Sequence, residues 1–108
     1  MAKKTIPQKI ERKIKSYVGL LKKDKLPIER VVLFGSYAKG RQSDSSDIDI
    51  CVVSPKFTDQ FDALQYLWLK RRYASDTDIE PIGFSPHDFA EDTSLTREIK
   101  RTGVEVKT

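Results

Sequence analysis

The sequence lacks several of the devices that small proteins use for stability or for membrane attachment. Its one cysteine, Cys51, excludes an internal disulfide and a cysteine-based metal cage. No run of about 18 apolar residues is present to span a membrane. The first ten residues, "MAKKTIPQKI", lack the apolar stretch and the cleavage site of a signal peptide. These absences predict a cytoplasmic protein without a membrane segment.

The composition is that of a folded domain with an uneven distribution of charge. Hydrophobic residues make up 38% of the chain and charged residues 33%, which favours a globular protein over a disordered one. The length predicts a single domain over residues 1–108. Residues 1–30 carry ten Lys and Arg against three acids. This basic part suits contact with nucleic acid, nucleotide phosphates or an acidic protein, and a solvated lysine-rich helix face explains it equally well.

The spacing of apolar residues predicts helices and strands in alternation. The expected elements are a helix over 6–23, a strand over 30–34, a short helix that opens in "GSYAKG" and closes at Gly40, a strand over 47–53, a helix over 58–74, a strand over 77–84, a helix start at Ser85, and a last helix over 93–102. This order predicts an α+β fold, a small mixed α/β arrangement in which helices pack on a mixed sheet.

Two details of this pattern concern the second half of the chain. Pro81 predicts that the strand over 77–84 lies at a sheet edge or contains a bulge. The helix over 58–74 is expected to turn four large side chains toward the core, namely Phe61, Leu64, Leu67 and Trp68.

Two aspartates, Asp47 and Asp49, stand in a strand that otherwise has the composition of a buried one. Residues two apart on a strand point the same way, so these carboxylates lie roughly 6.6 Å apart along it. They repel each other by about 2.5 kcal/mol at an effective dielectric of about 20. A divalent cation between them removes that cost, and oxygen ligands select Mg²⁺ or Mn²⁺. Because Mg²⁺ often completes its shell with substrate phosphates, the pair implies a triphosphate partner.

The turn that precedes the aspartates offers a site for phosphate. Gly35 lets the backbone approach a ligand closely, and Ser36 begins a helix whose free N–H groups attract phosphate oxygens. Lys39 and Arg41 either add positive charge to this site or are solvated loop residues. A P-loop is excluded because Arg41 stands where that motif requires lysine.

A third carboxylate from a neighbouring strand would complete a site for two metal ions. The strand over 77–84 offers two candidates, Asp78 and Glu80, which share one face. The lone histidine, His87, stands at a helix start and is interpreted as a surface residue without a catalytic role.

The stretch "GSYAKGRQSDSSDID" reads as Gly-Ser, ten residues, then Asp-x-Asp. It resembles the DNA polymerase β-like nucleotidyltransferase superfamily, and above all its minimal nucleotidyltransferases, small prokaryotic proteins encoded beside HEPN-domain partners. The flanking "ERVVLFGSYAKG" and "SDIDICVV" are similar to the same family. The resemblance extends from the N-terminal helix to about Phe84, and only the Gly-Ser-to-Asp-x-Asp stretch is highly specific. It implies a fold like the palm of polymerase β.

The resemblance also implies roles for particular residues. Gly35 and Ser36 would bind the triphosphate, while Asp47 and Asp49 would hold two Mg²⁺ ions.

The third carboxylate of this family usually sits between apolar residues of a later strand. Glu80 matches that setting better than Asp78, which remains the alternative, although the family more often has aspartate there. Glu80 would bind one metal ion and take the proton from the acceptor hydroxyl.

The function implied is Mg²⁺-dependent transfer of AMP from ATP, or of another NMP from its NTP, to a hydroxyl. The expected acceptor is a tyrosine of a HEPN-domain toxin ribonuclease, which would make this chain the antitoxin of a type VII toxin–antitoxin pair in a homo- or hetero-oligomer. The alternative is a catalytically weak binding module that neutralises a partner by occlusion or binds nucleic acid through its basic helix. Nucleic acid is the less favoured partner.

Overall fold

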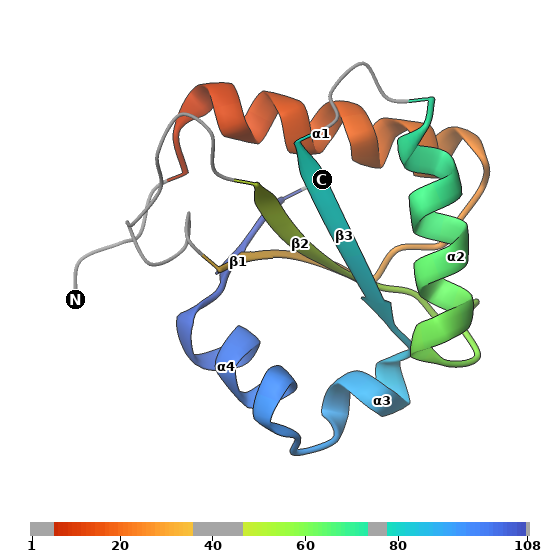
Figure 1. Cartoon of the computed structure of the whole chain (residues 1–108), viewed down its shortest axis with the longest axis vertical. Helices are drawn as coiled ribbons and strands as arrows, with labels where there is room; N and C mark the ends of the chain where they lie inside the picture. Colours follow the sequence, from red (N-terminus) through yellow and green to blue (C-terminus); the bar gives the residue numbers. More distant parts are fainter. Residues whose placement is uncertain (1–5, 36–46, 74–77, 108) are drawn as a thin grey trace.

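The computed structural model describes residues 6–35, 47–73 and 78–107 (Figure 1). Its elements in chain order are α1 (Gln8–Lys23), β1 (Arg30–Phe34), β2 (Ile48–Val53), α2 (Gln60–Arg71), β3 (Ile79–Phe84), α3 (Pro86–Ala90), α4 (Ser94–Thr102) and β4 (Val104–Glu105). The short helix expected in "GSYAKG" and the loop after it lie outside the described residues.

The described strands form one four-stranded sheet in the order β3-β2-β1-β4. β1 pairs with β2 and with β4 in antiparallel fashion, whereas β2 and β3 are parallel. The prediction of a small mixed sheet with helices packed on it is therefore confirmed. β4 was not predicted, because a strand of two residues after a helix leaves no periodic pattern to find.

Pro81 fits β3 because this strand forms an edge of the sheet. The carbonyls of Asp78 and Phe84 accept hydrogen bonds from the β2 side, so the even-numbered residues of β3 face β2. Pro81 faces away from β2, where its missing N–H removes no bond from the ladder. The prediction of an edge position is confirmed.

The core is divided between the two faces of the sheet. On one face, α1 and α2 pack against Ile48, Ile50 and Val52 of β2. On the other, α3 and α4 pack against Cys51 and Val53. The side chains of β2 therefore alternate as predicted: one set is buried by α1 and α2, and the other by α3 and α4.

α1 is the amphipathic helix that the apolar spacing predicts, beginning two residues later than expected. Its buried side chains are Ile10, Ile14, Tyr17, Val18 and Leu21. The Tyr17 hydroxyl donates to the Leu67 carbonyl at 2.6 Å, which ties α1 to α2 on this face. α1 has 16 residues and many charges; none of the helices in the described part of the chain is long and apolar enough to cross a membrane.

α2 is shorter than predicted, and it turns a different side to the core. Only Ala63 and Leu67 of its twelve residues are buried, whereas Phe61 is 68% exposed and Leu64 is 40% exposed. The expectation that these two and Trp68 face the core is wrong. α2 packs beside the edge strand β3, so a narrow stripe at spacing i, i+4 fills the contact.

Local signals set the ends of the later helices. Ser85 caps α3 and accepts a hydrogen bond from the Asp88 amide at 3.0 Å, as the sequence predicts. Thr93 caps α4 by a reciprocal pair of bonds with Thr96. α4 ends before Gly103, as expected.

Candidate active site

β1 ends, and β2 and β3 begin, at the same end of the sheet. In the antiparallel β1–β2 pair, Phe34 lies opposite Asp49, and in the parallel β2–β3 pair Asp49 lies opposite Glu80. Asp49 therefore stands between the turn after β1 and the first residues of β3. In Figure 1 this end faces the upper left, where β2 and β3 begin, and β1 ends at the left.

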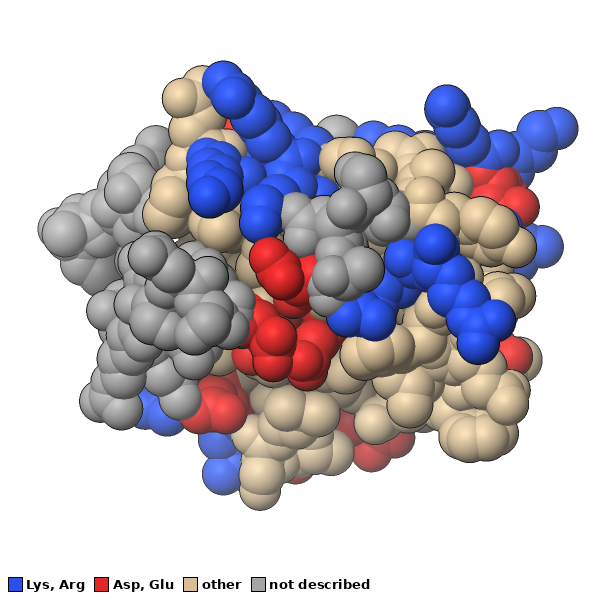
Figure 2. All heavy atoms as spheres, turned by 45° about the horizontal axis from the view of Figure 1, so that its top comes forward, with Lys and Arg blue, Asp and Glu red and all other residues tan. Residues whose placement is uncertain are grey.

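The three carboxylates singled out in the sequence lie near one another at this end. Asp47 is exposed immediately before β2, while Asp49 and Glu80 are partly buried on adjacent strands. Asp49 shares its face of the sheet with Cys51, on the side that α3 and α4 cover. Figure 2, in which this end comes forward, shows acidic side chains gathered at its centre with Lys and Arg beside them.

The electrostatics of the site reflect an excess of negative charge. The pKa of Glu80 is raised, first by a hydrogen bond with the Asp47 side chain, then by burial and by the charges of Asp47 and Asp49, while Arg71 opposes the rise. The pKa of Asp49 is raised by burial and, to a smaller extent, by Asp47. Carboxylates in this condition are stabilised by a cation, and their oxygens are the ligands that Mg²⁺ prefers. The donor set therefore fits a divalent metal ion.

The turn after β1 touches the acidic strand. Gly35 adopts a left-handed backbone with φ of +74°, a conformation that residues with a side chain rarely take. A Cβ atom added there would collide with the Asp49 carboxylate. The other residues predicted to bind nucleotide, namely Ser36, Lys39 and Arg41, lie outside the described residues.

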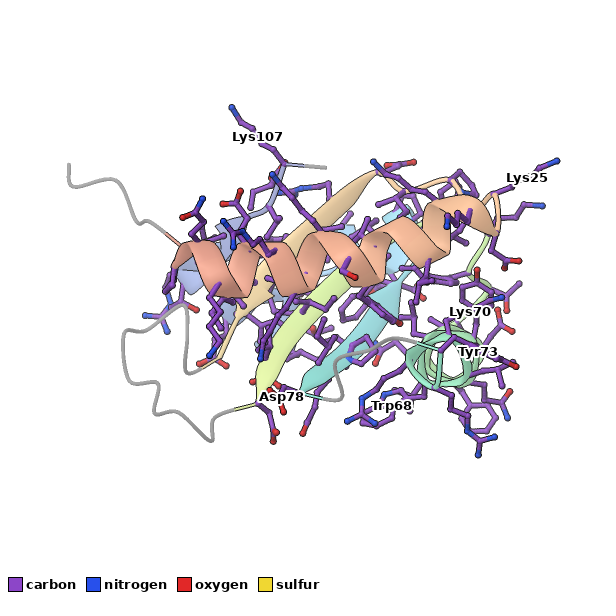
Figure 3. All side chains as sticks on the ribbon, turned by 90° about the horizontal axis from the view of Figure 1, so that it is seen from above. Lys25, Trp68, Lys70, Tyr73, Asp78 and Lys107 are labelled. Atoms are coloured by element: carbon purple, nitrogen blue, oxygen red, sulfur yellow. The ribbon has the colours of Figure 1, made fainter. Side chains whose placement is uncertain are left out.

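Asp78, the alternative third carboxylate, contacts a different element. Its side chain pairs with Lys13 of α1 at 3.0 Å and is 51% exposed. Figure 3 shows Asp78 at the start of β3, beneath α1. Of the two candidates, Glu80 is the one whose side chain contacts Asp47, which favours it as the third member of the site.

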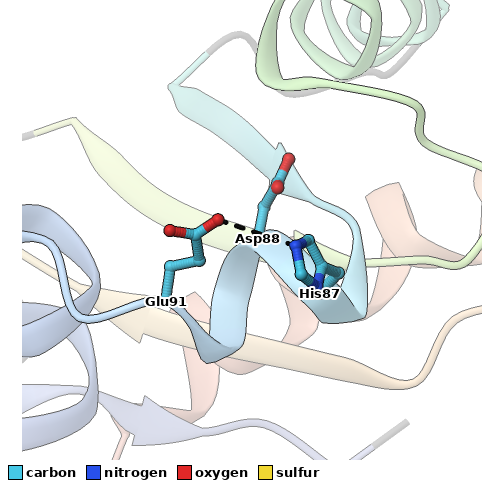
Figure 4. Close-up of side chains that lie close together, drawn as sticks. All are labelled: His87, Asp88 and Glu91. Carbon is cyan, nitrogen blue, oxygen red and sulfur yellow. Dashed lines mark ion pairs between the residues drawn. The ribbon is translucent and has the colours of Figure 1, made fainter.

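A second group of possible ligands lies at the far end of β3. His87, Asp88 and Glu91 bring their ligand atoms within 4.8 Å of one another on and just after the short helix α3 (Figure 4). His87 Nε2 is 3.7 Å from Glu91 Oε1, and its side chain is 87% exposed. The group is local to one exposed turn of helix, in agreement with the interpretation of His87 as a surface residue.

Two residues that sequence reasoning did not assign to the site lie beside Glu80. Trp68 Nε1 donates to the Pro81 carbonyl at 3.1 Å, and Arg71 Nε donates to the Ile79 carbonyl at 2.6 Å. They were missed because α2 was expected to bury Trp68 in the core. A Trp and an Arg three residues apart on a helix are a signal that could have found them, since such side chains stack.

Comparison with known proteins decides the family. A family model described as a nucleotidyltransferase domain matches residues 11–106. The chain belongs to this family. Two proposed protein adenylyltransferases of Methanocaldococcus jannaschii are similar to it. One is 31% identical over 99 residues, which span 90% of this chain and 95% of the relative. The other is 42% identical over 50 residues, 42% of this chain and half of the relative's own length.

Solved nucleotidyltransferase structures share the fold. A crystal structure of a toxin–antitoxin with AMP-PNP matches with a TM-score of 0.63 and 29% identity, over 90% of this chain and 72% of that one. A tri-AMPylated Shewanella oneidensis HEPN toxin in complex with MNT antitoxin matches with a TM-score of 0.59 and 25% identity, over 93% of this chain and 71% of that one. The resemblance first seen between Gly35 and Asp49 is confirmed, and so is the nucleotidyltransferase fold.

Proposed function

We propose that this nucleotidyltransferase transfers AMP from ATP, or NMP from another NTP, to a hydroxyl of a partner protein in a Mg²⁺-dependent reaction. The observation that carries the proposal is the alignment of Asp49 with Glu80 on adjacent strands, with the Gly35 turn against Asp49. The similarity to proposed protein adenylyltransferases supports a protein acceptor. The same proposal makes residues 1–108 one minimal nucleotidyltransferase domain.

Three carboxylates are proposed to hold the metal ions. Asp47, Asp49 and Glu80 would ligate two Mg²⁺ ions, with Mn²⁺ as a substitute and Asp78 as the alternative to Glu80. The raised pKa values of Asp49 and Glu80, and the oxygen donors of all three carboxylates, support this assignment. When bound there, such ions neutralise charge on the attacking and leaving oxygens.

The turn after β1 is proposed to hold the triphosphate. Gly35 brings the backbone to the edge of the carboxylate group, which supports an approach of phosphate at this point. Ser36 would contribute an N–H and a hydroxyl, and Lys39 and Arg41 would balance the phosphate charge.

Glu80 is proposed as the general base. Its carboxylate would accept the proton of the acceptor hydroxyl as that oxygen forms a bond to the α-phosphorus. The bond from the α-phosphorus to the bridging oxygen breaks, and pyrophosphate leaves. The environment of Glu80 supports this role, because a raised pKa makes a carboxylate a stronger base.

The proposed acceptor is a tyrosine of a HEPN-domain toxin ribonuclease. The structural similarity to an MNT antitoxin in complex with a tri-AMPylated HEPN toxin supports this partner. The chain would then act as the antitoxin of a type VII pair and assemble with its target in a homo- or hetero-oligomer. Because ATP is made and used in the cytoplasm, the same proposal places the protein there.

A labelling experiment tests the proposal. The protein is incubated with Mg²⁺, ATP labelled at the α-phosphate and the HEPN-domain protein encoded by the adjacent gene. We expect label on a tyrosine of that partner, and none after EDTA or with the double variant Asp47→Asn, Asp49→Asn. Asp92→Asn is the matched control, because Asp92 is an exposed acid paired with Arg97 before α4. An unlabelled partner, with both proteins folded, would contradict the proposal.

The basic surface of α1 favours a second candidate, a weak or inactive domain that binds its partner or nucleic acid. The exposed cations Lys9, Arg12, Lys22 and Lys23 support it. Protection of cells from the toxin that survives the double variant Asp47→Asn, Asp49→Asn would favour binding over chemistry. Nucleic-acid binding would instead weaken steeply with added salt.

A further inference from the structure

We propose that Trp68 and Arg71 of α2 are positioning residues that fix the backbone on both sides of Glu80. The role assigned to Glu80 rests on the proposed function, but the contacts that define the clamp do not. The clamp is defined as these two side chains and the two β3 carbonyls that they bind.

The clamp binds the outer edge of β3. Among the described strands β3 pairs with β2 alone, and the carbonyls of Ile79 and Pro81 point away from β2. On an ordinary edge strand such groups bind water and leave the strand held from one side. Here Arg71 and Trp68 take them, one residue before Glu80 and one residue after it.

The two donors form one unit. The Arg71 guanidinium lies 4.5 Å from the centroid of the Trp68 ring, so each side chain restricts the other. Figure 3 looks along α2 and shows Trp68 on the side of the helix toward β3. The planar guanidinium is preorganised, so that less entropy is lost per hydrogen bond formed, and the indole ring is large and rigid, which suits the two groups to hold a strand in place.

α2 is itself fixed against the rest of the molecule. The Tyr17 hydroxyl of α1 binds the carbonyl of Leu67, the residue before Trp68. Gly83 of β3 leaves room for α2 to approach, since a Cβ there would lie 2.7 Å from the Ala63 Cβ. The clamp therefore connects β3 to a helix that is itself bonded to α1 and packed closely on β3.

The consequence concerns the place of the Glu80 carboxyl relative to Asp49. Metal ligands act only when held near their working geometry, and the groups that orient them affect metal affinity by about 10- to 100-fold. Arg71 is also near enough for its charge to oppose the rise in the Glu80 pKa. Two backbone hydrogen bonds and one stacked pair thus fix the strand on either side of Glu80 and so orient its carboxylate.

The first test measures the strand itself, in protein without ATP or acceptor. Trp68→Phe removes the N–H and keeps a ring, while Arg71→Lys keeps the charge and removes the planar group. Arg72→Gln is the matched control, a neighbouring exposed cation at the end of the same helix. By NMR, we expect the amides of Glu80 and Ile82 to exchange about 5- to 10-fold faster in the first two variants. The control is expected to exchange like the wild type.

The second test measures the metal site. Mn²⁺ affinity, followed by electron paramagnetic resonance, is expected to fall about 10-fold in Trp68→Phe and Arg71→Lys and to stay unchanged in Arg72→Gln. In the transfer assay, kcat is expected to fall while KM for ATP stays near the wild-type value. If Trp68→Phe has the same amide exchange rates and the same Mn²⁺ affinity as the wild type, the proposal is overturned. An Arg71→Lys variant equal to wild type in both would do so as well, because it would assign the role to charge alone.

These outcomes separate the clamp from the proposed function. A wild-type protein that transfers no AMP contradicts the proposed function, yet the exchange measurement still tests the clamp. Circular dichroism melting of each variant establishes that it is folded, and Trp68→Phe, the milder change, carries the test where Arg71→Lys does not fold.

Discussion

The carboxylate of Asp49 lies against the backbone of Gly35, with no room between them for a Cβ atom on residue 35. The turn that follows β1 therefore packs directly against the acidic strand β2. A side chain at position 35 would have to displace the acid, the turn or both.

Gly35→Ala is expected to abolish transfer and to lower the free energy of unfolding by about 1–3 kcal/mol. Alanine is strained at a φ of +74°, and its methyl group would collide with Asp49. Urea unfolding and the labelling assay measure the two effects. Gly19→Ala is the control, because a Cβ there meets nothing within 4 Å. That change should raise stability by about 0.5–1 kcal/mol, since alanine favours helix. Full activity in Gly35→Ala would contradict the proposed site.

Asp49→Asn is expected to stabilise the metal-free protein at neutral pH. The raised pKa values of Asp49 and Glu80 mean that their ionisation disfavours the folded state. A carboxyl whose pKa is raised by folding contributes its full stabilisation when the pH lies below its ordinary pKa of about 4. This contribution is lost as the pH rises through the folded-state pKa. The variant should therefore be more stable than wild type near neutrality, with a difference that shrinks in acid. Urea unfolding over a pH series measures this difference.

Added Mg²⁺ is expected to reduce the difference in stability between Asp49→Asn and the wild type. A cation that binds the folded wild type raises its melting temperature, and Asp49→Asn removes one proposed ligand, so the variant should respond less. EDTA should reverse the effect. Equal responses to Mg²⁺ in the two proteins would remove Asp49 from the metal site.

Cys51 is expected to resist thiol reagents as long as the protein is folded. Its side chain is fully buried two residues beyond Asp49, and burial raises the pKa of the thiol to about 12. Little thiolate exists at mildly alkaline pH, and the reagent has no access to it. Colorimetric titration with a disulfide reagent should detect no thiol in the native protein and one per chain in guanidinium. Rapid reaction of the native protein would show that β2 opens at this point.

Gly83→Ala is expected to lower the free energy of unfolding by about 1–3 kcal/mol. The new methyl group would lie 2.7 Å from the Ala63 Cβ and 2.9 Å from Leu67 Cδ1, which forces α2 away from β3. Trp68, the single tryptophan of the chain, should then lose its bond to Pro81 and shift its fluorescence toward that of exposed indole. Unchanged stability and fluorescence would contradict the tight packing of α2 on β3.

The acidic strand was readable from sequence because several signals agreed there. Ile48, Ile50 and Asp49 alternate with a period of two, which identifies a strand and the face that its acids occupy. The pairing of Asp49 with Glu80 was not readable in this way. It depends on a parallel register between segments far apart in the chain. The strand pattern offered both Asp78 and Glu80, and only the family resemblance preferred Glu80.

The orientation of α2 could not be read from composition. Phe61, Leu64 and Trp68 are large and apolar, and a period of 3.6 places them near one face, yet the buried residues are Ala63 and Leu67. A helix beside an edge strand needs a narrow apolar stripe, whereas a helix across the middle of a sheet needs a broad one. Which face of α2 is buried depends on how the whole domain packs, and a local sequence pattern carries no information about that packing.

The outer edge of β3 has a consequence for how another molecule can reach Glu80. Pro81 has no amide hydrogen to offer a visiting strand, and the carbonyls of Ile79 and Pro81 are already occupied by α2. This rim of the sheet is closed to β-augmentation and to edge-to-edge aggregation. Under the proposed function, a partner protein that presents a hydroxyl to Glu80 cannot dock by backbone pairing along this edge, so side-chain contacts would have to select it.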